Sequence, residues 1–361
     1  MGFDPDRPHN DLPPLPPSAD VETRAVLKRA IAAARAMAEL KGLGGVIPNQ
    51  AMLVNTLVLQ EARASSEIEN IVTTNDALFQ AMASSAGARD PATKEVLRYR
   101  EALWHGFSRV KEGARIGADL SVELVQKIKE DSQGIRDQPG TVIGNPRTRE
   151  IIYTPPEGEA AIRRMLDDLE RFVHAEDALD PLVRLALMHY QFEAIHPFYD
   201  GNGRTGRLLN ILFLVQKGLL DLPVLYLSKY IIDRKPEYYR RLRQVTENGE
   251  WEAWVLYMLA AMEETDGLPR QRILAIRALL DETLERARRE LPARVYSKEL
   301  VELIFCQPYT KGQFVVDAGI AERQTAAEYL RELERIGVLE PHKVGRENLY
   351  LNRELYELLS R

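Results

Sequence analysis

The stretch HPFYDGNGRTGR, residues 196–207, decides how the rest of the chain is interpreted. Pro197 ends the helix before it, because a residue that precedes proline avoids the α conformation. Glycine and asparagine at 201–203 tolerate left-handed backbone, so their successive amides can point into one concavity. A helix that begins near Arg204 adds its N-terminal amides and the positive end of its dipole. The pattern predicts an anion cradle.

Charged side chains within the same stretch give the cradle a chemistry. Arg204 and Arg207 are three residues apart, so both guanidinium groups can face the cradle and bind phosphate oxygens. Asp200 lies at the rim, where a carboxylate beside a polyphosphate implies an intervening Mg²⁺. His196 can act as a general base at neutral pH. The combination predicts a phosphoryl or nucleotidyl transfer site.

A rival interpretation of this region is a metal hydrolase. His189, Glu193 and His196 are spaced so that they share one helical face. The order H-E-x-x-H is absent, and Pro197 turns the chain at the third candidate ligand. Such a metal site would also leave the glycines and arginines unexplained. We therefore expect His189 to be a hydrogen-bonded core residue.

The stretch resembles the Fic-domain pattern HPF-x-[DE]-G-N-G-R-x-x-R, with every fixed position present. HYQFEAIHPF at 189–198 looks like the helix that precedes the motif in that family. LPPLPP at 12–17 and the helices after it resemble the family's N-terminal extension. The resemblance covers nearly the whole chain and implies a mainly α fold: a Fic helical core with a β-hairpin flap, an N-terminal helical extension and a C-terminal winged-helix domain.

The resemblance implies a reaction, the transfer of AMP from ATP to a Ser, Thr or Tyr hydroxyl of a target protein. His196 would take the hydroxyl proton, Asp200 would hold Mg²⁺, and the last arginine would hold the γ-phosphate. Some relatives transfer UMP, phosphocholine or a γ-phosphate; the first motif glycine and the last arginine, both retained, favour AMP. The implied nucleotide-binding residues are Gly201, Asn202, Gly203, Arg204, Thr205, Gly206, Arg207 and Tyr239.

Residues 65–70, SSEIEN, match the Fic inhibitory pattern [ST]-x-x-x-E-[GN] through Ser65, Glu69 and Asn70. We expect this segment on a helix, from which Glu69 pairs with Arg207 and prevents that arginine from holding the γ-phosphate. Such a brake needs a bias of only about 1–3 kcal/mol. The same glutamate positions a water for removal of AMP in some relatives, and both roles stay open here.

β-branched and aromatic residues flank a turn at 144–146, which predicts a hairpin of 141–143 against 150–154. It resembles the family's substrate-docking flap, in which Ile151, Ile152 and Tyr153 would pair with the target as an added strand. The proline-rich arm before residue 18 should be extended, either as a free tail or laid across the body.

Elsewhere the chain predicts helix after helix. Asp20 and Ser121 are candidate N-caps. The predicted helices cover 21–42, 48–71, 92–112, 121–133, 157–175, 181–195, 204–217, 236–247, 251–263, 268–290, 297–306, 310–317 and 321–336, followed by two short strands around Gly345.

These patterns divide the chain into four parts: an N-terminal extension with the inhibitory helix (1–90), a Fic catalytic core (91–265), a helical linker (266–294) and a winged-helix-like domain (295–361). Residues 296–361 contain nine Lys/Arg and eleven Asp/Glu, a net charge of −2. That balance is poor for phosphate contacts, so we favour a protein-contact or dimerisation role over DNA binding by a nucleotide-sensing regulator. Relatives often form homodimers.

Composition sets the remaining limits. The 361 residues carry a net charge of −6, and Cys306 is the only cysteine, so an intrachain disulfide is excluded. A cytoplasmic setting fits best. Residues 42–60 form the longest uncharged run, but their glycines, proline and polar residues make it too polar and broken to span a bilayer. We therefore predict no membrane segment.

Overall fold

The computed structural model describes residues 3–43, 50–88, 90–145, 147–264, 267–344 and 347–360. Two helices at its centre, α7 (Pro181–Ile195) and α8 (Asn202–Gln216), are buried along nearly their whole length. The Asp180 carboxylate begins α7 by accepting hydrogen bonds from the amides of Leu182 and Val183, at 2.8 and 3.3 Å. The loop between the two helices carries the motif that the sequence singled out.

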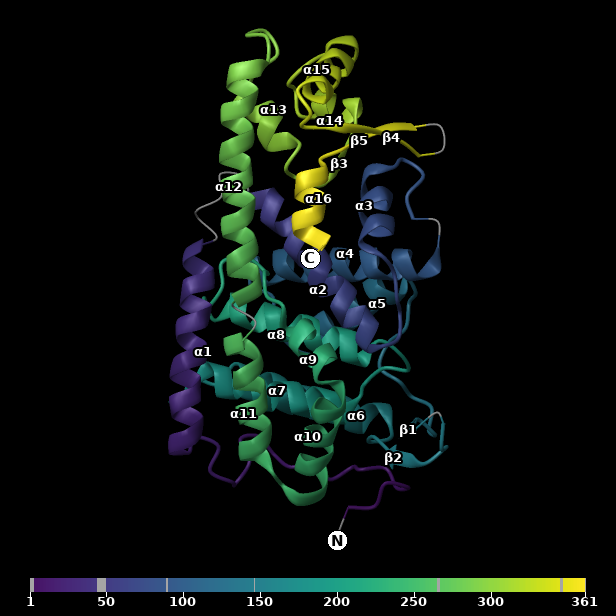
Figure 1. Cartoon of the computed structure of the whole chain (residues 1–361). Coiled ribbons are helices and arrows are strands. Elements are labelled where there is room, and N and C mark those ends of the chain that lie inside the picture. The colour runs from purple at the N-terminus through teal and green to yellow at the C-terminus, as the bar shows by residue number, and fades with distance from the viewer. Residues whose placement is uncertain are drawn as a thin grey trace.

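The other helices of the body surround this pair (Figure 1). Helices α4 and α5 pack on α8, α6 packs on α7, α2 lies against α4, α8 and α9, and α1 runs beside α11. Their bounds are α1 (Arg24–Leu43), α2 (Gln50–Ile68), α3 (Asn75–Ala83), α4 (Pro91–Lys111), α5 (Ala118–Lys129), α6 (Glu159–Val173), α9 (Leu227–Asp233), α10 (Lys235–Asn248) and α11 (Trp251–Glu264).

The N-terminal arm lies across the body and does not form a free tail. The amide of His9 donates to the carbonyl of Thr154 at 3.0 Å, and the Thr154 hydroxyl donates to the carbonyl of Pro5 at 2.6 Å. The side-chain amide nitrogen of Gln191, on α7, donates to the carbonyl of Pro13 at 3.1 Å. The proline-rich segment therefore runs beside the flap and the central helix (Figure 1).

A long helix, α12 (Gly267–Glu290), leads from the body to a C-terminal module (Figure 1). The module contains α13 (Lys298–Leu303), β3 (Tyr309–Thr310), α14 (Gly312–Asp317), α15 (Arg323–Arg335), β4 (Glu340–Val344), β5 (Glu347–Leu351) and α16 (Arg353–Ser360). Its sheet is antiparallel with the order β3-β5-β4. The module docks on the α3 segment: Tyr309 donates to Asp76 and Ser84 donates to Glu347, both at 2.7 Å.

The mainly helical fold predicted from the sequence is confirmed, with local corrections. Ser121 lies inside α5 and is not its N-cap; its hydroxyl donates to the carbonyl of Gly117, which holds the cap position. Helix α1 begins at Arg24 rather than after Asp20, and Thr23 accepts the amide of Val26 at 3.3 Å. The sequence missed α3, α9, α16 and β3. The predicted helix start at 48–49 and the turn at Gly345 lie outside the described residues.

Among the helices that the described ranges contain, none combines the length and the apolar character that a bilayer crossing requires.

Candidate active site

The loop between α7 and α8 is held in one conformation by its own residues. His196 ends α7 in the left-handed region, at φ 48°, and its amide donates to the carbonyl of Phe192 at 3.0 Å. The Asn202 side chain accepts from the amide of Phe198 and donates to its carbonyl, both at 2.8 Å. Gly201 has a φ of 86°, a backbone conformation that would be strained for a residue with an L side chain. The histidine and the start of α8 therefore have fixed positions.

Arg136, which the sequence analysis did not single out, ties this loop to the body. Its side chain is 1% exposed, and its Nε donates to the carbonyl of His196 at 2.8 Å. Nη2 donates to the carbonyls of Pro156 and, at 3.4 Å, Ile195. Its amide donates to the carbonyl of Pro197 at 2.9 Å. One arginine thus binds the backbone on both sides of the predicted base.

We expect Arg136→Ala to destabilise the chain by about 2–4 kcal/mol, because it leaves several buried carbonyls without donors. Chemical denaturation measures the change. Arg171→Ala is the control: the Arg171 side chain is 76% exposed and pairs with Asp168 at the surface, so its loss should cost under about 0.5 kcal/mol. Equal stabilities of the two variants would contradict this role of Arg136.

The protonation state of His196 suits a general base. Burial, and to a smaller extent the charge of Arg136, lowers its pKa to about 4. The imidazole is therefore neutral, and able to accept a proton, at any pH well above 4. Its Nδ1 is buried and has no hydrogen-bond partner among the described residues.

This pKa gives a pH prediction. In a chain with ¹³C-labelled histidine, the resonance that disappears in His196→Ala should still report neutral imidazole at pH 5.5. NMR titration measures it directly. A midpoint near 6.5 would show that the ring is not buried as described.

Glu69 lies at the start of α8, where an anion would bind. Its Oε1 is 2.8 Å from Nη2 of Arg207, whose side chain is 1% exposed. Arg207 also donates to the hydroxyl and carbonyl oxygens of Ser65, at 2.8 and 2.9 Å. A Cβ on Gly203 would lie 2.4 Å from the Glu69 oxygen. The predicted Ser65, Glu69 and Arg207 are thus brought together, over a glycine that leaves the carboxylate room.

The turn that follows α2 presents Glu69. The helix ends at Ile68, so Glu69 lies one residue beyond it and not within it as predicted. Asn70 has a φ of 63°, and its amide donates to the carbonyl of Glu67 at 3.0 Å. Asparagine tolerates this left-handed conformation better than most residues. The amide of Ile71 donates to the carbonyl of Ser66 at 3.0 Å and closes the turn.

Asp200, the predicted metal ligand, belongs to a group of four charged residues. Its Oδ2 is 2.5 Å from Nζ of Lys129, and its Oδ1 is 3.5 Å from Nη2 of Arg204. Glu95 contacts both cations: it pairs with Arg204 and lies 3.3 Å from the Lys129 nitrogen. Burial alone would raise the pKa of Asp200, but Lys129 and Arg204 outweigh it and keep that pKa lowered. No sequence pattern indicated a role for Glu95 or Lys129.

The buried Glu61 and the half-buried Glu193 also lie in the field of Arg207. Burial raises the pKa of Glu61 to about 7, although hydrogen bonds from Ser228 oppose the shift. The amide of Ser228 donates to Glu61 at 3.0 Å, which fastens α2 to α9. Burial likewise raises the pKa of Glu193 to about 7. The spacing of Glu61, Ser65 and Glu69 at i, i+4 and i+8 is the signal that would have revealed Glu61.

The remaining predicted nucleotide-binding residues differ in their surroundings. Tyr239, on α10, is 45% exposed and packs edge-on against Tyr238, with the ring centroids 5.2 Å apart. Thr205 is fully buried. A Cβ on Gly206 would point toward α7, 2.6 Å from an oxygen of Glu193. Thr205 and the face of α8 at Gly206 are therefore turned toward the interior, and Tyr239 is exposed to solvent.

The flap is a two-stranded hairpin, β1 (Ile143–Gly144) against β2 (Ile151–Tyr153), as the sequence predicted. Ile151 and Ile152 are half-buried. Tyr153 is different: its side chain is 9% exposed, and its hydroxyl donates to the carbonyl of Ala194 at 2.8 Å. Phe3 of the N-terminal arm stacks on its ring. Tyr153 therefore anchors the flap to the core next to the predicted base.

The rival metal-hydrolase arrangement is not formed. His189 is fully buried, its Nε2 lies 2.9 Å from the hydroxyl of Tyr238, and its ring stacks on Trp254. Burial lowers its pKa to about 3. Within the described ranges, no three His, Cys, Asp or Glu side chains are grouped so that they could hold a metal ion. His189 is a core residue, as expected.

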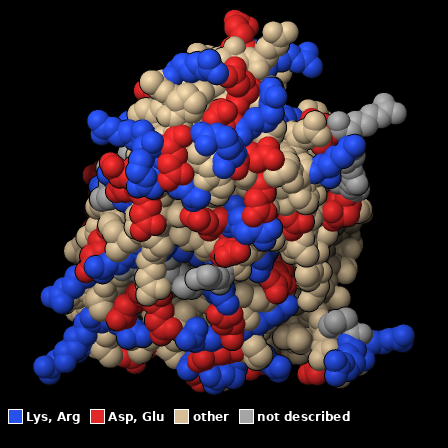
Figure 2. Space-filling view, turned by 45° about the horizontal axis from the view of Figure 1, so that its top comes forward, with Lys and Arg blue, Asp and Glu red and all other residues tan. Residues whose placement is uncertain are grey.

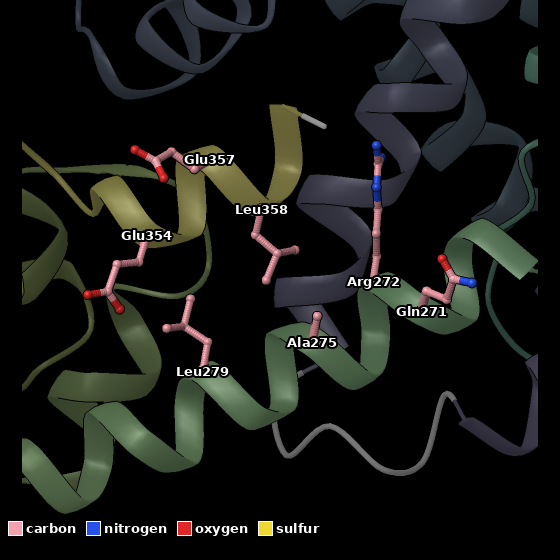
Figure 3. A pocket seen from close by; sticks show the side chains of 7 residues that line it. All are labelled: Gln271, Arg272, Ala275, Leu279, Glu354, Glu357 and Leu358. Carbon is pink, nitrogen blue, oxygen red and sulfur yellow. The ribbon is translucent and has the colours of Figure 1, made fainter.

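A separate groove of about 480 Å³ lies between α12 and α16 (Figure 3). Ala275, Leu279 and Leu358 form its apolar part, and Gln271, Arg272, Glu354 and Glu357 form its polar part. None of the motif residues lines it. The groove results from the crossing of α16 over α12 and is not part of the candidate site.

Comparison with known proteins now identifies the family. Residues 27–108 match the sequence model of the Fic/DOC family N-terminal region, and residues 119–214 match that of the Fic/DOC family. The chain belongs to the Fic/DOC family. Residues 279–355 match the C-terminal domain described as protein adenylyltransferase SoFic-like.

Fic relatives and solved Fic structures agree with this result. The chain is 29% identical over 190 residues to protein adenylyltransferase Fic of Drosophila erecta, covering 48% of the chain and 37% of the relative. It is 29% identical over 153 residues to protein adenylyltransferase fic-1 of Caenorhabditis briggsae, covering 41% of the chain and 27% of the relative. The matches thus span well under half the length of these relatives.

The fold is similar to that of a Fic family protein from Desulfovibrio desulfuricans G20, with a TM-score of 0.59, 18% identity, and coverage of 94% of this chain and 98% of that one. Fic-1 of C. elegans, residues 134–508, gives a TM-score of 0.51 at 20% identity, covering 69% of this chain and 73% of that one. At these identities the likeness concerns the Fic fold.

Proposed function

We propose that this chain is a protein adenylyltransferase that moves AMP from ATP to a Ser, Thr or Tyr hydroxyl of a target protein and is restrained by Glu69. The observation that carries the proposal is the convergence at the start of α8. A neutral histidine, a glycine-lined helix N-terminus and the buried Arg207 meet there, and a carboxylate occupies the anion position. The names of the Fic relatives support the same chemistry.

The residues of the site divide the reaction between them. His196 accepts the proton of the target hydroxyl, whose oxygen attacks the α-phosphorus. The bond to the β-phosphate oxygen breaks, and pyrophosphate leaves. The amides at the start of α8 and the guanidinium of Arg204 stabilise the phosphate charge. Arg207, once released from Glu69, binds the γ-phosphate and so orients the α-phosphate.

Mg²⁺ fits the site as part of a metal–nucleotide complex. The Asp200 side chain is 61% exposed and offers carboxylate oxygens at the rim of the cradle. A single protein carboxylate together with substrate phosphates and waters is the usual surrounding of Mg²⁺ in nucleotide sites. Bound there, the metal would neutralise charge on the α- and β-phosphates.

The flap supplies the surface for the target. Its strand β2 ends at the buried Tyr153, whose hydroxyl contacts Ala194 two residues before His196. A target segment added as a strand beside Ile151 and Ile152 would therefore lie next to the base. This mode of docking reads backbone more than sequence, so it admits targets of many kinds.

The position of the label tests the proposed reaction. With a cell lysate, the Glu69→Gly chain should transfer more label to protein from ATP labelled at the α-phosphate than its His196→Ala counterpart does, whereas ATP labelled at the γ-phosphate should give no difference between the two chains. Transfer from the γ-position alone would establish phosphorylation instead and would overturn the proposal.

DNA binding by the C-terminal module finds little support in the charge distribution. On the face that Figure 2 shows, lysines and arginines are interspersed with aspartates and glutamates, and outside the residues drawn in grey they form no continuous basic field. We therefore expect the full chain to show no salt-dependent binding to duplex DNA at micromolar concentration. Fluorescence anisotropy with a labelled duplex measures it. Tight binding that weakens steeply with salt would favour a regulator.

A further inference from the structure

Lys129 and Glu95 place a second pair of charges beside the predicted metal ligand. Lys129 comes from α5 and Glu95 from α4, and both side chains are largely buried, at 23% and 22% exposure. The Lys129 nitrogen lies 2.5 Å from Asp200 and 3.3 Å from Glu95, so it has two carboxylate acceptors. Its stem passes over the motif: Cγ and Cδ lie 3.8 Å from where a Cβ on Gly201 would be.

This arrangement leaves Asp200 engaged before any metal arrives. Its Oδ1 accepts a hydrogen bond from the amide of Gly201 at 2.6 Å, and its Oδ2 accepts one from the ammonium group of Lys129. A cation that binds this carboxylate competes with the ammonium group, since both seek the same oxygens. Glu95 provides a second acceptor at the same nitrogen, so the displaced ammonium group would not be left as an unpaired, half-buried charge.

We propose that Lys129 is a positioning residue that neutralises Asp200 until the metal–nucleotide complex binds, and that Glu95 receives the ammonium group when the metal displaces it. This inference rests on the proposed function. On this inference the two residues set the metal affinity of the site. Lys129 weakens metal binding, and Glu95 makes that weakening smaller.

The two residues should act in opposite directions. Lys129→Met removes the competing charge while keeping the stem over Gly201, so the site should bind metal about five- to tenfold more tightly in the presence of nucleotide. Glu95→Gln should weaken metal binding, because the ammonium group loses its second carboxylate partner and keeps only a neutral acceptor. In the double variant, the Glu95 substitution should lose most of its effect, since the group that it receives is gone.

The test uses the full chain with Glu69→Gly, so that the cradle is open in every sample. Mn²⁺ binding is titrated by electron paramagnetic resonance in the presence of an ATP analogue with a methylene bridge between the α- and β-phosphates. Calorimetry gives the affinity of the analogue, and thermal melting confirms that each variant folds. Lys127→Met, at an exposed position of the same helix, is the matched control and should leave Mn²⁺ affinity unchanged. Lys129→Gln replaces Lys129→Met if the latter does not fold.

Each outcome decides a point. Tighter Mn²⁺ binding by Lys129→Met, with a Glu95→Gln effect that disappears in the double variant, supports the inference. Unchanged Mn²⁺ affinity overturns the inference and leaves Lys129 a structural role. Effects of Glu95 and Lys129 that simply add also overturn it, because they indicate only a long-range electrostatic effect of each charge. Weaker analogue binding without tighter Mn²⁺ binding makes Lys129 a phosphate ligand and also overturns it. If the parent chain binds no metal–nucleotide complex, the proposed function itself fails, and this inference with it.

Discussion

Replacing Glu69 by glycine is expected to raise the labelling of the chain and of its targets by α-labelled ATP about 5- to 150-fold. The Glu69 carboxylate lies 2.8 Å from Arg207 and fills the space above Gly203. In the proposed reaction, removing it would free the guanidinium for the γ-phosphate and would remove a negative charge from the proposed phosphate site. The rate of label incorporation at saturating ATP measures the gain.

Glu67→Gly is the matched control for this result. Glu67 lies two residues earlier, in the last turn of α2, and the hydrogen bonds that the described residues give to Arg207 involve Ser65 and Glu69 instead. It introduces the same glycine near the end of the same helix and should leave labelling unchanged. The brake is ruled out if Glu69→Gly labels no faster than the parent chain, or if Glu67→Gly produces the same gain.

Replacing His196 by alanine is expected to lower transfer by about 10²- to 10⁴-fold, the contribution of a general base. The measurement needs the Glu69→Gly background, so that transfer is fast enough to follow. ATP affinity should remain close to that of the parent, because the cradle is built from the start of α8 and from Arg207, which the substitution does not remove.

His105→Ala is the control for this second prediction. His105 pairs with Glu123 between α4 and α5, and among the described residues no hydrogen bond or ion pair is found between His105 and the motif loop. A loss of ATP affinity that parallels the loss of transfer would mean that His196 shapes the cradle and is not a base. Undiminished transfer by His196→Ala would remove the histidine from the mechanism altogether.

The sequence predicted those parts of the site that are local in the chain. The glycines, arginines and aspartate of the motif all lie in one loop and at the start of one helix, so their proximity could be predicted from the sequence. The pair of Ser65 and Glu69 followed from the resemblance of residues 65–70 to the Fic inhibitory pattern. The motif at 196–207 is long and restrictive, so its pattern is specific without knowledge of the fold. The pattern at 65–70 is short, and it gains weight from the motif that follows it in the chain.

Residues that act on the motif from other elements were not predictable in this way. Arg136, Lys129 and Glu95 reach the loop from distant parts of the chain, and each is an ordinary charged residue in its own segment. Their importance comes from tertiary contacts, which leave no periodic signal in the sequence. The missed elements α3, α9 and α16 have a related cause, since helices of nine residues or fewer give few repeats of an apolar pattern.

Mass spectrometry of proteins labelled by the Glu69→Gly chain tests the central claim most directly. Peptides from a lysate incubated with this chain and ATP should carry the mass of one AMP, less one water, on a Ser, Thr or Tyr hydroxyl, and the His196→Ala counterpart should yield none. Phosphoryl groups that appear only with His196 and without AMP, or AMP in equal amount with and without His196, would contradict adenylyl transfer by this site.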